Sequence, residues 1–373
     1  MSNDTRPEIR FPGFTEDWEE RKLGELTESF DGKRVPIDSD LRISGKYPYY
    51  GATGIIDYVD DYIFNGEYVL LAEDGANIIM RNYPVAYLTQ GKFWLNNHAH
   101  IMRMRNGSNY FLVQVLEKID YKKYNTGTAQ PKLNSKIVKN IELKIPHIEE
   151  QQQIGNFFKQ LDDIIALHQR KLDLLKETKK GFLQKMFPKN GAKVPEIRFP
   201  GFTEDWEERK LGDITKISTG KLDANAMVEN GKYDFYTSGI KKYRIDVAAF
   251  EGPSITIAGN GATVGYMHLA DNKFNAYQRT YVLQEFLVDR SFIFSEIGNK
   301  LPKKIKQEAR TGNIPYIVMD MLTELKLSIP QNNSEQQKIG TFFKQLDDTI
   351  TLHQRKLDLL KETKKGFLQK MFV

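Results

Sequence analysis

The chain has 373 residues, 40% of them hydrophobic and 28% charged, which is typical of a globular protein with about two or three domains. It contains no cysteine, which excludes disulfides, thiolate nucleophiles and zinc ribbons and favours a cytoplasmic location. The formal net charge of +5 is a weak indication of a polyanionic partner. The sequence shows no basic region followed by an apolar stretch and no run of about eighteen apolar residues, so we expect neither secretion nor membrane spanning.

An internal duplication organises the chain. Residues 7–26 recur as residues 195–214 with eighteen of twenty positions identical, and residues 168–187 recur unchanged as residues 353–372. Between these frames the sequence has diverged, although VLLAEDGAN still corresponds to ITIAGNGAT, and LKIP to LSIP. Each half therefore consists of a short leader, a globular part and a long helix.

The globular parts, about residues 25–146 and 213–330, predict more strand than helix. Short β-branched and aromatic runs such as YVLLA and SITIA alternate with Gly, Asn and Asp turns, and FLVQVLEKI and FIFSEIGNKL predict short helices. We expect an α+β fold with two globular α/β domains separated by two long antiparallel coiled-coil helices, related by a pseudo-twofold internal duplication. The predicted division is a first domain 1–146, a central helix 147–187, a second domain 188–330 and a C-terminal helix 331–373.

Both long helices carry apolar residues at alternating steps of four and three, which predicts a coiled-coil seam. The seam residues are Ile154, Phe158, Leu161, Ile165, Leu172, Leu175 and Phe182 in the first copy and Ile339, Phe343, Leu346, Ile350, Leu357, Leu360 and Phe367 in the second. His168, Lys179, His353 and Lys364 interrupt it. Polar residues in a seam usually fix register, but His168 could also face out of a slightly shifted seam.

The helix starts differ between the copies. Ser334 and Gln337 have the spacing of a capping box in the second copy. The first copy has Glu149 and Glu150 instead, which we expect to stabilise the positive end of the helix dipole.

Signatures of catalysis are absent from the sequence. It contains no Asn- or Asp-Pro-Pro-aromatic cluster, no G-x-x-x-x-G-K-[ST] loop and no G-x-S-x-G elbow. GNGATVG at residues 259–265 predicts a tight turn rather than a dinucleotide loop, since its spacing is wrong and its first copy keeps only one glycine. His98 and His100 alternate along a predicted strand, where they could form a metal pair or face a ligand.

Polar and aromatic side chains that suit phosphates and base edges gather instead on glycine-rich loops. The candidates in the first domain are Lys33, Arg34, Lys46, Tyr49, Tyr50, Thr53, Asn97, His98, Thr126, Thr128, Gln130 and Lys132. Those in the second domain are Lys221, Tyr236, Thr237, Ser238, Lys241, Lys242, Arg244, Asn260, Gln278, Arg279, Arg310, Thr311 and Asn313. Two related domains with divergent loops and matching helices predict a reader of two different short DNA sites.

The chain resembles the specificity subunits of type I restriction-modification enzymes over its whole length. The resemblance rests on YYGATGIIDYV, WLNNHAH, TGTAQPKLN and the I-P…E-Q-x-x-I helix starts. The second domain departs from it, with TGNIPYI in place of TGTAQPKLN, and both helix starts lack the double proline common in the family.

The resemblance implies a target recognition domain in each half, a bipartite site in double-stranded DNA, and helices that set the gap and dock two modification subunits. It also implies that the chain is not an enzyme and binds no cofactor. S-adenosylmethionine, ATP and magnesium would belong to the modification subunits and to restriction subunits that translocate and cut.

Two alternatives from other classes remain open. Asp320, Glu324 and Lys326 match an acid followed by E-x-K, as in metal-dependent nucleases, although the first copy lacks the equivalent aspartate and the residues also suit the polar face of a last strand. A coiled-coil adaptor that binds no nucleic acid is the other alternative.

Overall fold

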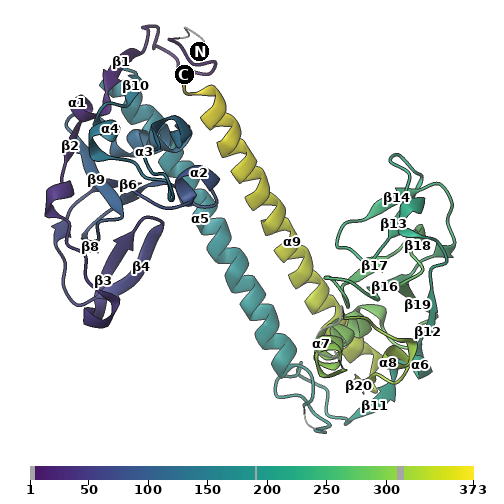
Figure 1. Ribbon diagram of the computed structural model, residues 1–373. Coiled ribbons are helices and arrows are strands. Elements are labelled where there is room, and N and C mark those ends of the chain that lie inside the picture. The colour runs from purple at the N-terminus through teal and green to yellow at the C-terminus, as the bar shows by residue number, and fades with distance from the viewer. Residues whose placement is uncertain (1–4, 190, 309–314) are drawn as a thin grey trace. The chain divides into compact units, whose positions relative to one another are not determined.

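The structure, a computed structural model, describes residues 5–189, 191–308 and 315–373 (Figure 1). It divides into two units, one formed by residues up to 169 with 355–373 and the other by residues 170–354. Each unit thus holds one globular part, the start of one long helix and the end of the other. This differs from the predicted division into four parts, because the helix ends pack into the globular cores.

The first unit contains ten strands and the shorter helices that join them, all among the described residues. Its elements are β1 (Glu19–Lys22), α1 (Leu23–Leu26), β2 (Thr27–Ser29), η1 (Asp31–Lys33), η2 (Ser39–Leu41), β3 (Ser44–Gly51), β4 (Gly54–Val59), β5 (Phe64–Asn65), β6 (Tyr68–Ala72), α2 (Asn77–Met80), β7 (Ala86–Thr89), β8 (Lys92–Leu95), β9 (Ala99–Met104), α3 (Asn109–Lys118), η3 (Tyr121–Tyr124), α4 (Ser135–Lys139), β10 (Glu142–Ile145) and the start of α5 (Ile148–Lys185).

The second unit repeats this order with small changes. Its elements are β11 (Trp206–Lys210), α6 (Leu211–Ile214), β12 (Lys216–Thr219), η4 (Ala224–Ala226), β13 (Tyr233–Tyr236), β14 (Tyr243–Ile245), β15 (Phe250–Glu251), β16 (Ser254–Ala258), β17 (Met267–Ala270), β18 (Lys273–Ala276), β19 (Thr280–Gln284), α7 (Arg290–Glu308), α8 (Met319–Thr323), β20 (Lys326–Pro330) and the start of α9 (Asn333–Lys370).

The sheets of the two units have the same topology. One four-stranded sheet has the order β2-β9-β6-β7 in the first unit and β12-β19-β16-β17 in the second; the other has β4-β3-β8-β5 and β14-β13-β18-β15. A two-stranded ribbon pairs the leader with the last strand, β1 with β10 and β11 with β20. The predicted α+β fold and internal duplication are confirmed.

The central strand of each unit is buried on both faces. In β6, Val69 and Leu71 pack in the core beneath α3, whereas Tyr68 and Leu70 pack in a second core with Phe93 of the other sheet. Because alternate residues of a strand point to opposite faces, both sets are buried when both faces are covered, and in β6 both sets are apolar. This is why YVLLA reads as an uninterrupted apolar run. In the equivalent strand β16, Ile255 and Ile257 form one set, and the other contains the buried Ser254 and Thr256.

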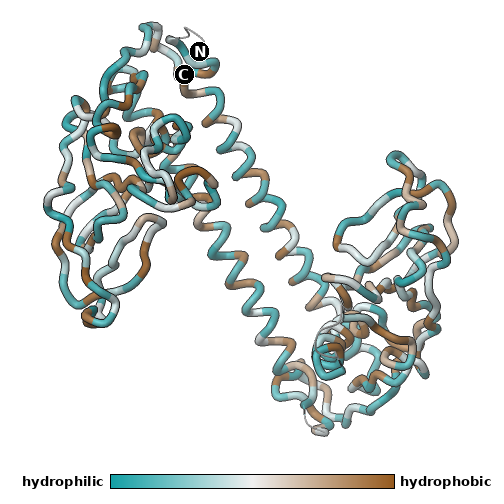
Figure 2. The backbone as a smooth tube through the Cα atoms, viewed as in Figure 1, coloured by the Kyte–Doolittle hydropathy of each residue, from teal (hydrophilic) through white to brown (hydrophobic). Residues whose placement is uncertain are grey.

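The long helices follow the predicted seam, and Figure 2 shows hydrophobic segments recurring along both of them. None of the fourteen seam residues is exposed. Ile154 and Phe158 also join the globular core of the first unit with Trp18 and Phe372, so this end of the seam is part of a domain core. Ile339 and Phe343 do the same in the second unit.

Within each unit the two helix segments run antiparallel. In the first unit Phe157 meets Phe367 with ring centroids 5.0 Å apart, and the Asp162 carboxylate lies 2.6 Å from Lys364 Nζ. In the second unit the equivalent contacts are Phe182 with Phe342, also at 5.0 Å, and Lys179 Nζ with Asp347 at 2.5 Å. The seam lysines therefore form half-buried interhelical ion pairs, as residues that fix register do.

Two predictions about the helix starts were wrong: the capping box of Ser334 and Gln337, and the role of Glu150 at the helix dipole. The α9 cap is Asn332, whose side-chain oxygen accepts a 2.9 Å hydrogen bond from Ser334 N–H, so Ser334 lies inside the helix and forms no capping box. In α5, Glu149 is exposed in the first turn as expected, but Glu150 is fully buried and bonded to Arg10.

The Arg10 and Glu150 pair ties the leader to the helix. Arg10 donates two hydrogen bonds of 2.7 Å to the two carboxylate oxygens of Glu150. Arg198 and Glu335 repeat this pair in the second unit at 2.7 and 2.8 Å. A bidentate guanidinium satisfies the oxygens that burial removes from water, so the pair can stand in the core.

Candidate nucleic-acid interface

Apart from Lys33, which is exposed at the end of η1, the candidate residues of the first domain fall into two groups. Arg34, Asn97, His98 and the 125–133 loop gather around the turn that follows β6, where the backbone of Glu73 donates to His98 O and that of Gly75 to Pro131 O. The second group lies on the hairpin of β3 and β4 in the other sheet: Lys46, Tyr49, Tyr50 and Thr53.

The 125–133 loop is held by its own hydrogen bonds. The Asn125 side-chain oxygen accepts from Gly127 N–H and Lys132 N–H, both at 2.9 Å, and Thr126 N–H donates to Lys132 O at 2.9 Å. A Cβ on Gly127 would lie 1.7 Å from Gln130 O, so only glycine allows this close turn. Thr126, Thr128, Gln130 and Lys132 are left exposed on it.

A charged network lies beneath this loop. Arg34 donates to Glu73 at 2.6 Å, and His100 Nδ1 lies 2.7 Å from Asp31. Burial by itself raises the pKa of the Asp31 carboxyl, but the hydrogen bond and charge of His100, with the Ile101 amide and Arg34, hold that pKa below its ordinary value. Since its guanidinium is engaged internally and mostly buried, Arg34 belongs to the network rather than to a phosphate-binding surface.

The hairpin presents only part of its candidate set. Lys46 and Thr53 are exposed, and Tyr50 is half-buried with its ring stacked on Tyr87 at 5.8 Å. Tyr49 is 1% exposed, and its hydroxyl accepts a 3.0 Å hydrogen bond from Ile37 N–H. The assignment of Tyr49 to DNA binding was therefore wrong: it is a core residue.

The two predicted strand histidines have different environments. His98 is exposed, with Nδ1 2.9 Å from Asp74, whereas the His100 side chain is 1% exposed. Within the described ranges, His, Asp and Glu side chains form no group suited to holding a metal ion. The metal pair considered for these histidines therefore has no support.

The second domain exposes Lys221, Lys241, Lys242, Arg244, Gln278 and Arg279. Ser238 and Asn260 are half-buried and share a 2.5 Å hydrogen bond. Tyr236 and Thr237 are buried, which corrects their predicted role at a DNA-facing surface. The ring of His268 lies 5.1 Å from Tyr236, in the place that Tyr87 occupies beside Tyr50 in the first domain. Arg310, Thr311 and Asn313 lie outside the described residues.

The residues proposed for a nuclease have other partners. Glu324 lies 2.6 Å from Lys210 Nζ, and Lys326 Nζ lies 2.8 Å from Glu208. Lys210 and Glu208 both belong to β11, the partner strand of β20. These charges form exposed ion pairs at the β11–β20 ribbon, which favours the interpretation as a polar strand face.

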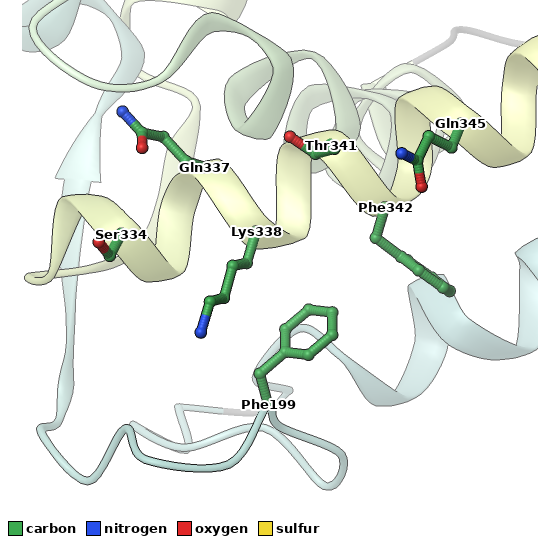
Figure 3. Close-up of a pocket in the computed structure, with 7 residues that line it drawn as sticks. All are labelled: Phe199, Ser334, Gln337, Lys338, Thr341, Phe342 and Gln345. Carbon is green, nitrogen blue, oxygen red and sulfur yellow. The ribbon is translucent and has the colours of Figure 1, made fainter.

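A surface groove of about 410 Å³ lies between the leader of the second unit and the start of α9. Figure 3 shows the Phe199 ring and the Lys338 side chain extending toward each other from the two sides. Phe199 contacts Phe342 edge-on at 6.1 Å, as Phe11 contacts Phe157 at 6.0 Å in the first unit. The groove belongs to the repeated frame rather than to the divergent loops.

The sequence profile of the type I restriction modification DNA specificity domain matches residues 15–177 and 203–362. The chain belongs to this family. It is a type I specificity subunit with two specificity domains, each comprising one divergent globular part and most of one long helix.

Relatives over nearly the full length carry the same description. A putative type I restriction enzyme specificity subunit of Haemophilus influenzae is 27% identical over 94% of this chain and 93% of its own length. The MjaVIII specificity subunit of Methanocaldococcus jannaschii is 24% identical over 95% and 91%. The crystal structure of an S subunit from M. genitalium, 16% identical, matches with a TM-score of 0.80 over 99% of both chains, which shows the shared fold. Among the described residues, no helix has the length and apolar character needed to cross a bilayer.

Proposed function

We propose that this specificity subunit reads a two-part sequence in double-stranded DNA, one part with each domain, and performs no catalysis itself. Two modification subunits would dock on it and carry S-adenosylmethionine. Restriction subunits would supply the ATP- and magnesium-dependent steps. The observation that carries the proposal is the pair of specificity domains, which share one sheet topology but expose different loop residues.

The loops support two different half-sites. The first domain exposes Thr126, Thr128, Gln130 and Lys132 on a single loop, next to Asn97 and His98. Among the candidates of the second domain that the structure describes, the exposed ones are mainly cations, including Lys241, Lys242 and Arg279. Amide and hydroxyl groups suit base edges and cations suit phosphates and guanine, so the domains have different binding preferences.

The long helices support a role in setting the gap between the half-sites. Each has 38 residues, which corresponds to a length of about 57 Å at 1.5 Å per residue. Their sequences are nearly the same in the two copies, as expected for elements that fix a distance and do not read DNA.

The same helices carry unusual exposed apolar residues. Ile164, Leu167 and Leu174 on α5 are 43%, 56% and 67% exposed, and Leu352 and Leu359 on α9 are 65% and 67% exposed. Within each helix these residues are three or seven positions apart, so they lie on one face of that helix. Such a face suits an apolar helix of a partner, and its presence on both copies suits two identical modification subunits.

The test is to express the chain with its modification partner and map methylated adenines across the host genome. We expect a split motif, one half of which changes when residues 25–146 are replaced by another such domain while the other half stays the same. Absence of any split motif would refute the proposal. A complex that assembles independently of salt and binds no DNA would instead support the adaptor alternative.

A further inference from the structure

In both domains one buried side chain, from β9 or from the equivalent strand β19, contacts an equivalent backbone carbonyl. In the first domain His100 Nε2 lies 2.8 Å from Leu133 O; in the second the Tyr281 hydroxyl donates to Ile317 O, also at 2.8 Å. His100 and Tyr281 occupy equivalent places, since His100 pairs with Leu71 of β6 and Tyr281 with Ile257 of β16. Both are nearly inaccessible, with His100 at 1% and Tyr281 at 8% exposure.

The carbonyls that they hold are equivalent too. Leu133 N–H donates to Glu73 O, and Ile317 N–H donates to Gly259 O, each at 2.7 Å. Leu133 ends the loop that exposes Thr126, Thr128, Gln130 and Lys132. In the chain of the second domain, Ile317 follows the predicted readers Arg310, Thr311 and Asn313. His100 and Tyr281, called the anchors below, therefore bind the backbone just after the candidate DNA-reading residues in the chain.

The three residues around His100 all differ from the equivalent three around Tyr281. By strand register, Thr219 stands where Asp31 stands, and Gly259 where Glu73 stands. A Cβ on Gly259 would lie 2.4 Å from the Arg279 backbone oxygen and 2.9 Å from the Tyr281 ring, so both the neighbouring strand and the tyrosine leave room only for glycine at this position. Arg34, three residues after Asp31, corresponds by the same count to Leu222. One domain uses four charged or ionisable residues and the other uses Thr219, Leu222, Gly259 and Tyr281.

The histidine anchor lies between two carboxylates and a backbone carbonyl. Its Nδ1 faces the carboxylates of Asp31 at 2.7 Å and Glu73 at 3.7 Å, while Nε2 faces a carbonyl. Both ring nitrogens thus face oxygen atoms of the surrounding protein. Glu73 in turn lies 3.6 Å from Lys132 Nζ, and the Asp31 carboxylate accepts from Ile101 N–H at 2.9 Å. The imidazole thereby connects the sheet that contains β9 to a residue of the exposed loop.

We propose that His100 and Tyr281 are positioning residues for DNA recognition, each fixing the backbone of its own domain at Leu133 or Ile317 against the sheet that contains β9 or β19. Neither is placed to touch DNA. Each acts through the carbonyl that it binds, and in the first domain also through the Glu73 and Lys132 pair. This inference rests on the proposed reading of one half-site by each domain.

The experiment uses the full chain assembled with its modification partner. DNA binding is measured with oligonucleotides that carry the mapped motif or a single base change in one half. Tyr281→Phe removes one hydroxyl and keeps the ring, so we expect a loss of discrimination of about tenfold, the equivalent of one hydrogen bond, in the half read by the second domain. His100→Phe should have the matching effect on the other half alone.

Rescue separates positioning from a general loss of structure. The combined change Asp31→Thr, Arg34→Leu, Glu73→Gly and His100→Tyr installs the anchor of the second domain in the first. It should restore first-half discrimination to within about threefold of wild type, since the lost hydrogen bond is remade. His100→Tyr alone should not restore it, because Glu73 carries the Cβ that Gly259 lacks.

Several results would overturn the inference. Equal losses in both halves after either phenylalanine change would indicate a general effect on folding, and unchanged discrimination after Tyr281→Phe would show that the anchor does not act on recognition. If His100→Phe does not fold, Tyr281→Phe decides the matter alone. A complex that methylates no two-part sequence would refute the proposed function, whereas an intact motif with unaffected discrimination would refute only the positioning role.

Discussion

Replacing Arg10 by methionine tests whether the leader and the helix start form one structural element. Glu150 is fully buried, and both its oxygens depend on the guanidinium, at 2.7 Å each. Arg10→Met keeps most of the aliphatic volume but leaves a carboxylate with no counter-charge in the core. Removing one partner of a buried ion pair costs about 3–5 kcal/mol in free energy of unfolding. We expect a loss in this range.

The assay must report each unit separately, because the chain holds two cores. Hydrogen exchange followed by mass spectrometry should show faster exchange in peptides from residues 7–26 and 147–160, with peptides from the second unit unchanged. Arg198→Met is the matched variant and should reverse this pattern. The double change Arg10→Met with Glu150→Met should recover most of the loss, since an apolar pair can replace a buried ion pair. A loss below about 1 kcal/mol, or a double variant as unstable as the single one, would refute the reasoning.

Three further predictions follow from other elements. Burial raises the pKa of Glu296 to about 7, so the stability that the protonated carboxyl contributes is complete below the ordinary pKa of a glutamate and is lost as the pH rises through 7. Glu296→Gln should therefore raise the free energy of unfolding by up to about 3 kcal/mol above pH 7 and change it little near pH 4. Denaturant titrations at several pH values measure this difference. Inserting one heptad after Lys171 and another after Lys356 keeps the seam in register and lengthens each helix by about 10 Å. The gap in the mapped motif should then grow by roughly three base pairs. An unchanged gap would contradict the spacing role. Gly181→Ala and Gly366→Ala place a methyl group in open space on a helix and should each raise stability by about 1 kcal/mol in urea melts, with loss of stability as the contrary result.

The repeated frame was largely predictable from the sequence. The steps of three and four give the helix face directly, so the seam from Ile154 to Phe182 was found by counting. The place where the seam joins a domain core was not predicted, because Phe158 packs in one core with Trp18 and Phe372, which are far from it in the chain. Periodicity reports that a face is buried and does not report which segment buries it.

The candidate interface was predicted less well. Tyr49 and Arg34 are polar residues of loop-like segments, and nothing near them in sequence reveals that Ile37 and Glu73 engage them. His100 was noticed only through its spacing from His98, and Tyr281 was not noticed at all. The sequence offered a signal for Glu73 alone, since aligning VLLAEDGAN with ITIAGNGAT places it opposite Gly259. The equivalence of His100 with Tyr281 rests on strand register, which only the structure provides.

The contact between Ile9 N–H and Lys370 O, at 2.9 Å, has a counterpart in the second unit between Ile197 N–H and Lys185 O, also at 2.9 Å. In the second unit the polypeptide runs directly from one of these residues to the other, whereas in the first they are 361 positions apart. The same local structure therefore forms with or without the covalent link. A gene half as long, whose product paired with a second copy of itself, could have made both contacts before duplication joined them. Once two copies are joined in one chain, the loops of one globular part can change while those of the other stay the same.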